Sequence, residues 1–163
     1  MKLHRTFPLK HRMTRFPRFF LLLVIILGAG SSGFLSATEK TNPSVACAVT
    51  VREPKSGPGS TITLEVKLTP VQGVHINMTP PIDVRLDSNA AIGSAGALQF
   101  PKPTKDGYFD ATRPFTLPIT LARSAVRGKQ TISGTVVYFF CSDKDGVCSR
   151  FKQKFEVSLT VSR

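Results

Sequence analysis

Apolar and polar residues alternate along several segments of the chain. In residues 61–69, every second residue is a large aliphatic one and the residues between them are polar. A period of two is typical of a β-strand with one buried face. The same pattern predicts further strands at 45–51, 115–121, 132–140 and 155–161, and shorter ones at 74–78 and 82–86.

Turn-forming residues separate these segments, and no segment has the 3.6-residue period of an amphipathic helix. The small, glycine-rich residues 90–97 are expected to form a loop. Pro118 cannot donate to a strand ladder, which indicates that residues 115–121 form an edge strand or contain a bulge. About seven short strands without helices favour an all-β fold, an antiparallel β-sandwich, with a closed barrel as the alternative.

The first 37 residues resemble a secretory signal peptide. Six of the 22 Lys and Arg residues lie before position 19, and the apolar run 19–28 follows them. This run is shorter than the roughly 20 apolar residues that a membrane span requires. We therefore expect cleavage after Ala37, with a retained N-terminal anchor as the alternative. A short linker, 38–44, would then precede a domain at 45–163, periplasmic or otherwise exported, that meets the membrane only through the signal segment.

The formal net charge of +12 overstates the charge of the predicted domain. Without the six N-terminal cations, 16 basic and 10 acidic side chains remain, and they are scattered along the sequence. A nucleic-acid-binding surface would need clustered cations that neutralise phosphates, so no nucleic-acid partner is expected.

Two cysteines flank a predicted hairpin turn near the C-terminus. Cys141 ends the strand predicted at 132–140, and Cys148 opens the segment that leads into the last strand. Asp145 and Gly146 favour a tight turn between them. The cysteines would then face each other across an antiparallel pair, where Cα atoms lie about 4.5–5.5 Å apart, within reach of a disulfide.

The spacing leaves two interpretations of this disulfide open. Closing so short a ring stabilises a domain by only about 2.5 kcal/mol on the chain-entropy model, which is a modest structural staple. An exposed tip is also where an exchange partner can reach a sulfur atom. The surrounding charges do not decide between the two, because Asp143 and Asp145 would raise a thiol pKa whereas Lys144 and Arg150 would lower it.

The third cysteine and the single histidine outside the signal segment give weaker signals. Cys47 shares a predicted strand face with three valines, so we expect a buried, unreactive thiol. One histidine, His75, and two cysteines lack the fourth ligand and the spacing of a zinc site. No third group is evident that would orient His75 as a base for a cysteine nucleophile. We expect His75 at a strand edge, bonded to backbone, and no metal or cofactor.

The block around the two late cysteines resembles a known family, the periplasmic N-terminal domains of the thiol:disulfide interchange protein DsbD, also called disulfide-bond-corrector-like domains. The resemblance covers about residues 45–162, and its most specific part is the order strand, cysteine, polar tip, cysteine, strand. The residues that carry it are Phe-Thr-Leu-Pro-Ile-Thr at 115–120, Gly128, Tyr-Phe-Phe-Cys at 138–141, Cys148, Gly-Val-His-Ile-Asn at 73–77, and Pro80 with Pro81.

This resemblance implies an immunoglobulin-like sandwich in which Cys141 and Cys148 cycle between dithiol and disulfide. Reducing equivalents would come from a thioredoxin-like or DsbD-like membrane electron donor and pass to exported acceptor proteins that contain disulfides. The tip, with six residues between the cysteines, is slightly longer than in the best-known members. Their aromatic cap loop has only a brief counterpart here, at 105–109.

Two hypotheses about function follow. The first is an exported thiol–disulfide exchange module, a component of a protein-disulfide reductase system that acts with a separate electron donor. The second is a non-enzymatic β-sandwich for binding or envelope structure, in which the same disulfide is only a staple.

Overall fold

The computed structural model describes residues 41–162. The predicted signal peptide, 1–37, and the start of the predicted linker lie outside the described residues. Within residues 41–162 the chain forms nine β-strands and no helix, and so no helix that could cross a membrane.

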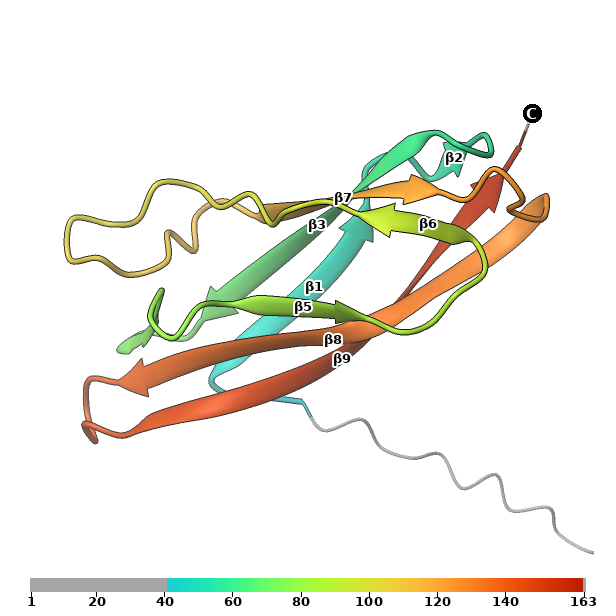
Figure 1. The fold of residues 1–163 in the computed structure, drawn as a ribbon. Coiled ribbons are helices and arrows are strands. Elements are labelled where there is room, and N and C mark those ends of the chain that lie inside the picture. Colours follow the sequence, from blue (N-terminus) through green and yellow to red (C-terminus); the bar gives the residue numbers. More distant parts are fainter. Residues whose placement is uncertain (1–40, 163) are drawn as a thin grey trace, which may run out of the picture. The chain divides into compact units, whose positions relative to one another are not determined.

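The strands form two sheets, which Figure 1 shows as two layers. The first sheet has the order β1 (Val45–Val51), β3 (Thr61–Pro70), β7 (Phe115–Leu121) and β6 (Ile92–Ala95). The second has the order β2 (Lys55–Ser56), β9 (Cys148–Val161), β8 (Gly128–Ser142) and β4 (Val74–Ile76), and β5 (Asp83–Leu86) also pairs with β8. All pairs are antiparallel except β2 with β9.

This order of strands is that of an immunoglobulin constant-type sandwich. Such a domain places strands A, B, E and D in one sheet and C, F and G in the other. In the order of the first sheet, β1, β3, β7 and β6 correspond to A, B, E and D. In the second sheet, β9 and β8 correspond to G and F, and β4 and β5 together correspond to C. The predicted immunoglobulin-like β-sandwich is therefore confirmed, and the closed-barrel alternative is wrong.

The core forms where the period-two faces of the two sheets meet. Strand β7 buries every second residue, and the predicted inward residues of β3 are fully buried. Tyr138 of β8 is also fully buried, and its hydroxyl accepts a hydrogen bond from Asn42 Nδ2 at 3.1 Å. This bond ties the start of the described chain to the second sheet. The largest fully buried side chains are Tyr138, Phe115, Ile62, Leu64, Leu68, Ile76, Ile119, Leu121, Ile132, Leu159, Val45 and Val66.

Strand pairing differs from the sequence prediction in the first sheet. Residues 92–95, expected to be loop, form the edge strand β6. Small side chains gave them no apolar alternation, and backbone pairing with β7 holds them. Strand β7 is consequently internal rather than an edge. Pro118 is accommodated where β6 ends, and its carbonyl still accepts a hydrogen bond from Gly96 N at 2.8 Å. The β6–β7 register shifts between Ile92 and Ser94.

A second difference is β2, which lies between the strands predicted at 45–51 and 61–69, where the turn-forming residues 54–59 predict a turn. Its two residues pair in parallel with the end of β9, extending the second sheet by one short strand.

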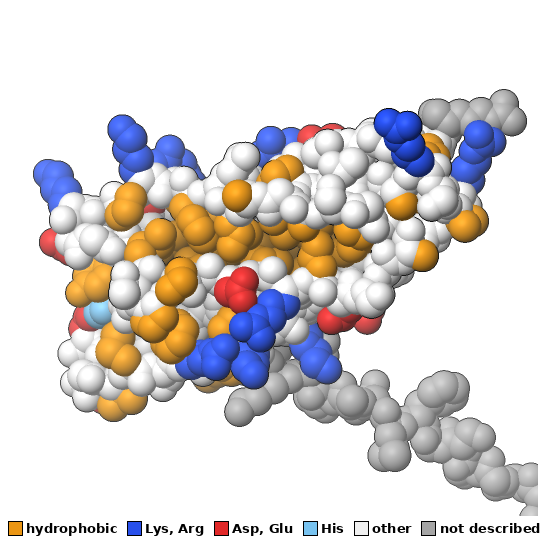
Figure 2. Space-filling model, viewed as in Figure 1, with side chains coloured by type: hydrophobic (Ala, Val, Ile, Leu, Met, Phe, Trp, Pro, Cys, Tyr) orange, Lys and Arg blue, Asp and Glu red, His pale blue; other side chains and the backbone are white. Residues whose placement is uncertain are grey.

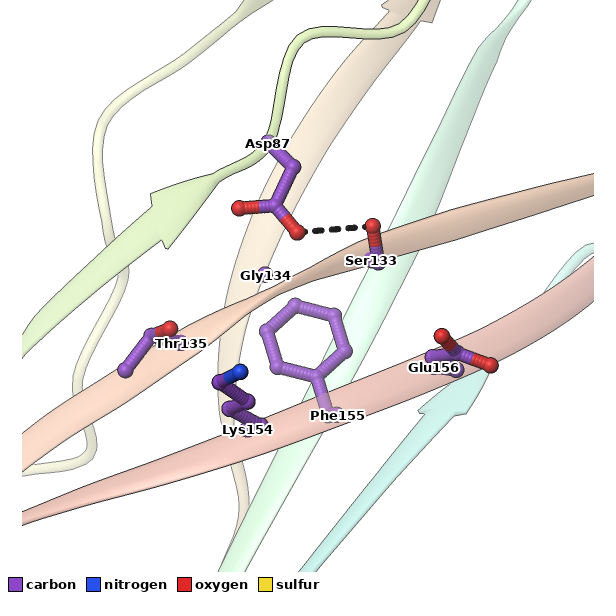
Figure 3. A pocket seen from close by; sticks show the side chains of 7 residues that line it. All are labelled: Asp87, Ser133, Gly134, Thr135, Lys154, Phe155 and Glu156. Atoms are coloured by element: carbon purple, nitrogen blue, oxygen red, sulfur yellow. Dashed lines mark hydrogen bonds between the residues drawn. The ribbon is translucent and has the colours of Figure 1, made fainter. Parts of the chain in front are cut away.

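Gly134 of β8 marks a close approach within the second sheet. A Cβ atom at this position would lie 2.5 Å from the Arg85 carbonyl oxygen and 2.9 Å from the Phe155 ring. The Phe155 ring therefore covers the space that a side chain would fill, as Figure 3 shows. Glycine lets β5 and β9 both pair closely with β8 at this level.

Candidate functional site

The β8–β9 hairpin places the two late cysteines directly opposite each other. Its register runs without a break from Gly128 and Val161 to Cys141 and Cys148. The cysteines form the predicted disulfide, with Cα atoms 4.0 Å apart. One position further, Ser142 N donates to the Val147 carbonyl. Because backbone groups alternate sides along a strand, the cysteines form a non-hydrogen-bonded pair, in which side chains lie closest.

The disulfide lies on the outer face of the second sheet. The even-numbered residues 132–138 of β8 are buried in the core, so the odd-numbered ones point away from it. The two sulfur atoms belong to residues of different accessibility. Cys141 is 7% exposed, whereas Cys148 is exposed to solvent. A partner in solution can therefore approach the bond from the Cys148 side.

The exposed hairpin tip is held in place by hydrogen bonds. Gly146 has φ 64°, and its N–H donates to the Ser142 carbonyl at 2.9 Å, which confirms the predicted turn. The Ser142 hydroxyl donates to Asp145 Oδ2 at 3.2 Å. On the other side, Asp143 N donates to the Gly73 carbonyl, which joins the tip to the turn before β4.

Strand β4 supplies polar side chains to the disulfide. His75 lies opposite Cys141 in the register, on the same face of the sheet. Two residues further along, Asn77 Nδ2 donates a hydrogen bond to Cys141 Sγ at 3.3 Å. The sulfur of the more buried cysteine thus has a neutral donor, and Cys148 is the more exposed residue of the pair.

His75 contacts groups from two other segments. Its Nδ1 lies 2.8 Å from Asp143 Oδ1, and its ring stacks on Tyr108 with centroids 3.9 Å apart. His75 lies on an edge strand, as predicted, but the expected backbone partner is wrong, because the Asp143 carboxylate holds the ring. The contact with Asp143 fixes the orientation of the His75 ring and joins residues 68 positions apart in the sequence.

Residues 105–109, where the resemblance predicted a brief cap loop, lie beside the site. Phe109 N donates to the Ile76 carbonyl at 2.9 Å, and the backbones of Asn77 and Tyr108 form an isolated antiparallel β-bridge. Tyr108 therefore covers His75, while Cys148 stays exposed. Together these groups line an open groove of about 440 Å³. Its lining residues are His75, Asn77, Tyr108, Cys141, Ser142, Asp143, Gly146 and Cys148.

Two other hollows carry less chemistry. A hollow of about 420 Å³ lies on the other side of His75 and Tyr108, against the 104–112 loop. Another, of about 210 Å³, lies around Phe155 and contains the bond from Ser133 Oγ to Asp87 Oδ2, as Figure 3 shows. Neither has a cysteine among its lining residues. Across residues 41–162, no three His, Cys, Asp or Glu side chains gather as metal ligands would.

Cys47 is separate from the site. It lies on β1, is free and half-buried, and packs against the core. Burial raises the pKa of its thiol to about 11. Since the thiolate is the reactive form, the predicted unreactive thiol agrees with this environment.

Several solved structures are similar to this chain at a distance. The N-terminal domain of DsbD from Neisseria meningitidis, in the reduced form, is 14% identical, with 72% of this chain and 86% of that chain covered and a TM-score of 0.38. AggA, the major subunit of aggregative adherence fimbriae type I from Escherichia coli, is 12% identical, with 76% and 99% covered and a TM-score of 0.41. A chain of a type I cohesin–dockerin complex from Clostridium thermocellum is 15% identical, with 72% and 99% covered and a TM-score of 0.40.

No protein-family model and no curated protein matches the sequence. The similar structures include a DsbD N-terminal domain, a fimbrial subunit and a cohesin–dockerin complex, and likeness at this level does not distinguish among their functions.

The environment of Cys47 predicts slow alkylation in the folded protein. Raising the pKa from 9.0 to about 11 lowers the thiolate fraction near neutral pH by about 100-fold. Iodoacetamide should therefore modify Cys47 slowly, at a rate that rises about tenfold per pH unit and levels off only near pH 11. Peptide mapping of the oxidised protein measures this rate. A disulfide that contains Cys47, or a rate that levels off near pH 8, would contradict the assignment.

Proposed function

We propose that this protein is an exported thiol–disulfide exchange module whose Cys141–Cys148 pair carries two electrons from a dithiol donor to a protein disulfide. One observation carries the proposal: an exposed cysteine is bonded to a buried one whose sulfur accepts a hydrogen bond. The sequence resemblance to the DsbD N-terminal family supports the same role. A disulfide persists in oxidising compartments, which fits export.

The reductive half begins at the exposed sulfur. A thiolate of a thioredoxin-like donor attacks Cys148 Sγ, the Cys141–Cys148 bond breaks, and a donor–Cys148 disulfide forms. Cys141 leaves as a thiolate and then takes a proton from water. The second thiolate of the donor attacks its own bonded sulfur, which releases Cys148 as a thiolate and leaves the donor as a disulfide.

The oxidative half returns the pair to its starting state. The Cys148 thiolate attacks a disulfide of an exported acceptor protein, and one acceptor sulfur leaves as a thiolate. Cys141, deprotonated, then attacks Cys148 Sγ. This step re-forms the Cys141–Cys148 bond and releases the second acceptor thiolate, so the acceptor gains both electrons.

Asn77 supports the role of Cys141 as leaving and resolving group. Its Nδ2 already lies within hydrogen-bond distance of Cys141 Sγ in the disulfide form. A hydrogen bond to a charged group is worth about 1.5–3 kcal/mol, more than one to a neutral group. The bond therefore strengthens as negative charge develops on Cys141, which lowers the barrier to opening the disulfide.

His75 and Asp143 support the geometry of the attack. The Asp143 carboxylate lies at the tip and His75 on β4, so their 2.8 Å contact joins the turn to the neighbouring strand. The ring of Tyr108 packs on the other side of His75. We assign these residues a positioning role, because they keep the tip at a fixed distance from Asn77 when the disulfide is open.

The two cysteines should behave differently when mutated singly. In Cys141→Ser the exposed nucleophile remains without its resolving partner. A thioredoxin-like protein whose own resolving cysteine is replaced by serine, and whose other cysteine is activated as an aryl disulfide, should therefore be trapped as a mixed disulfide, with the aryl thiolate as leaving group. In Cys148→Ser the remaining thiol is buried, so at least tenfold less complex should form. Non-reducing electrophoresis and mass mapping measure both products.

The trapping comparison needs two controls, one for folding and one for the third cysteine. Both variants lose the same disulfide, and circular dichroism should show that both keep their β structure. Cys47→Ala serves as a background substitution that should leave trapping unchanged. Equal trapping by both cysteine variants, or a complex formed through Cys47, would refute the assignment of roles.

Substitution of Asn77 tests the stabilisation of the leaving sulfur. Asn77→Ala should slow reduction by dithiothreitol about tenfold, since 1.4 kcal/mol corresponds to a factor of ten in rate. Asn77→Asp should slow it further, because a carboxylate cannot donate and repels the thiolate. Urea unfolding of the reduced forms provides the control. Reduction rates that follow stability, or an Asn77→Asp rate equal to wild type, would remove Asn77 from the mechanism.

A further inference from the structure

The register of the second sheet defines the surface around the disulfide. Residues that pair directly share a face, so each outward residue of β8 lies beside an outward residue of β9. Beyond the disulfide, the successive outward pairs are Phe139 with Arg150, Val137 with Lys152, and Thr135 with Lys154. We call the strip formed by these six residues the basic face.

Three consecutive outward positions of β9 on this face are cationic. Arg150, Lys152 and Lys154 are all exposed and lie about 7 Å apart, at two residues per step along a strand. This spacing is below the screening length of roughly 8 Å at physiological ionic strength, so the cations repel one another. Within residues 41–162, no ion pair joins any of the three to an acid.

The centre of the basic face offers little apolar surface. Val137 is 3% exposed, and Phe139 is half-buried with the Arg150 guanidinium carbon 5.8 Å from its ring centroid. Figure 2 shows Lys and Arg side chains gathered over the middle of the second sheet, with an acidic side chain against them and hydrophobic side chains between them and the histidine. Phe139 therefore adds a limited apolar surface to a strip whose exposed residues are mainly cationic.

The basic face ends at a change of charge sign. The next outward residue of β9 is Glu156, which pairs with Ser133, and Asp87 bonds to that serine. The outward cations of β9 therefore lie in the half that leads to the disulfide, while the outward Lys129 of β8 lies at the far end. On the other side of β8, Asp83 of β5 lies beside Val137 and forms an ion pair with Arg85. Such a polarised strip can orient a partner as well as attract it.

We infer that the basic face is the docking surface for redox partners whose surface around the reactive cysteines is acidic. The inference rests on the proposed function, because the strip begins at the disulfide and continues from its exposed side. An acidic partner would relieve the repulsion among the three cations and reach Cys148 while lying along β9. Opposite charges would also raise the rate of encounter, and salt would reduce that gain.

Two synthetic dithiol peptides test the inference. Both carry the core Cys-Gly-Pro-Cys, one flanked by glutamates and the other by lysines. Each peptide's rate with hydroxyethyl disulfide, which is uncharged, corrects for intrinsic thiol reactivity. After this correction, the acidic peptide should reduce the Cys141–Cys148 bond of the mature chain about tenfold faster than the basic one at low salt. The ratio should approach one in 0.5 M NaCl.

Reversing the charge of two lysines tests whether the basic face causes the preference for the acidic peptide. Lys152→Glu with Lys154→Glu should abolish or invert the preference. The matched control, Arg127→Glu with Lys129→Glu, makes the same change of charge at the opposite end of the hairpin and should keep it. Dithiothreitol, which is uncharged, should reduce all three proteins at similar rates.

The outcomes separate this inference from the proposed function. If dithiothreitol and both peptides fail to reduce the folded protein, the exchange function itself fails. Equal corrected rates for the two peptides, or the same loss in the control pair, would overturn the docking inference and leave exchange intact. Binding of wild type but not of Lys152→Glu/Lys154→Glu to phosphatidylglycerol vesicles, with peptide rates unchanged, would assign the face to anionic lipid and also overturn it.

Discussion

The fixed register of the β8–β9 hairpin is the constraint on which the site depends. Fourteen consecutive residue pairs hold the two strands together, and the last of them is the pair of cysteines. A slip of one residue would turn the outward residues of one strand inward and separate Cys141 from Cys148. The core prevents this slip, because Ile132, Val136 and Tyr138 are fully buried only in the observed register.

The same constraint gives the disulfide two unequal ends. Cys141 lies inside the sheet, between β4 and β9, where neighbouring strands cover it and Asn77 can reach its sulfur. Cys148 lies toward the margin of the sheet, beside a six-residue tip, and is exposed. In the proposed exchange, attack from solvent and departure of a stabilised thiolate would therefore involve different sulfur atoms. The cationic residues of β9 lie on the same outward face as Cys148, because they are separated from it by even numbers of residues along the strand.

The sequence predicted the features that depend on local pattern. Alternation in β3, β7 and β8 predicted their buried faces, and Asp145 with Gly146 predicted the turn that pairs the cysteines. The strand β6 carried no such signal, because Gly93, Ser94 and Ala95 have no large apolar side chains and are held by backbone pairing alone. The same holds for β2.

The rest of the site could not be predicted because it depends on contacts between distant segments. Asn77 and Cys141 are 64 residues apart, and His75 and Asp143 are 68 apart. Tyr108 reaches His75 from a third segment. The motif that contains His75 and Asn77 pointed to β4, but only the pairing of β4 with β8 assigns these side chains to the disulfide. The composition also did not predict the basic face, because its three cations are every second residue of one strand and do not form a run of basic residues in the sequence.

The reduction potential of the Cys141–Cys148 pair tests the central claim most directly. It can be measured on the folded protein by equilibration with glutathione or dithiothreitol buffers, followed by alkylation and mass analysis. An exchange pair should equilibrate in the folded state at a potential above roughly −300 mV, within the range where thioredoxin-like donors work. A potential below that value, or a disulfide that opens only when the domain unfolds, would contradict the account and leave the bond as a structural staple.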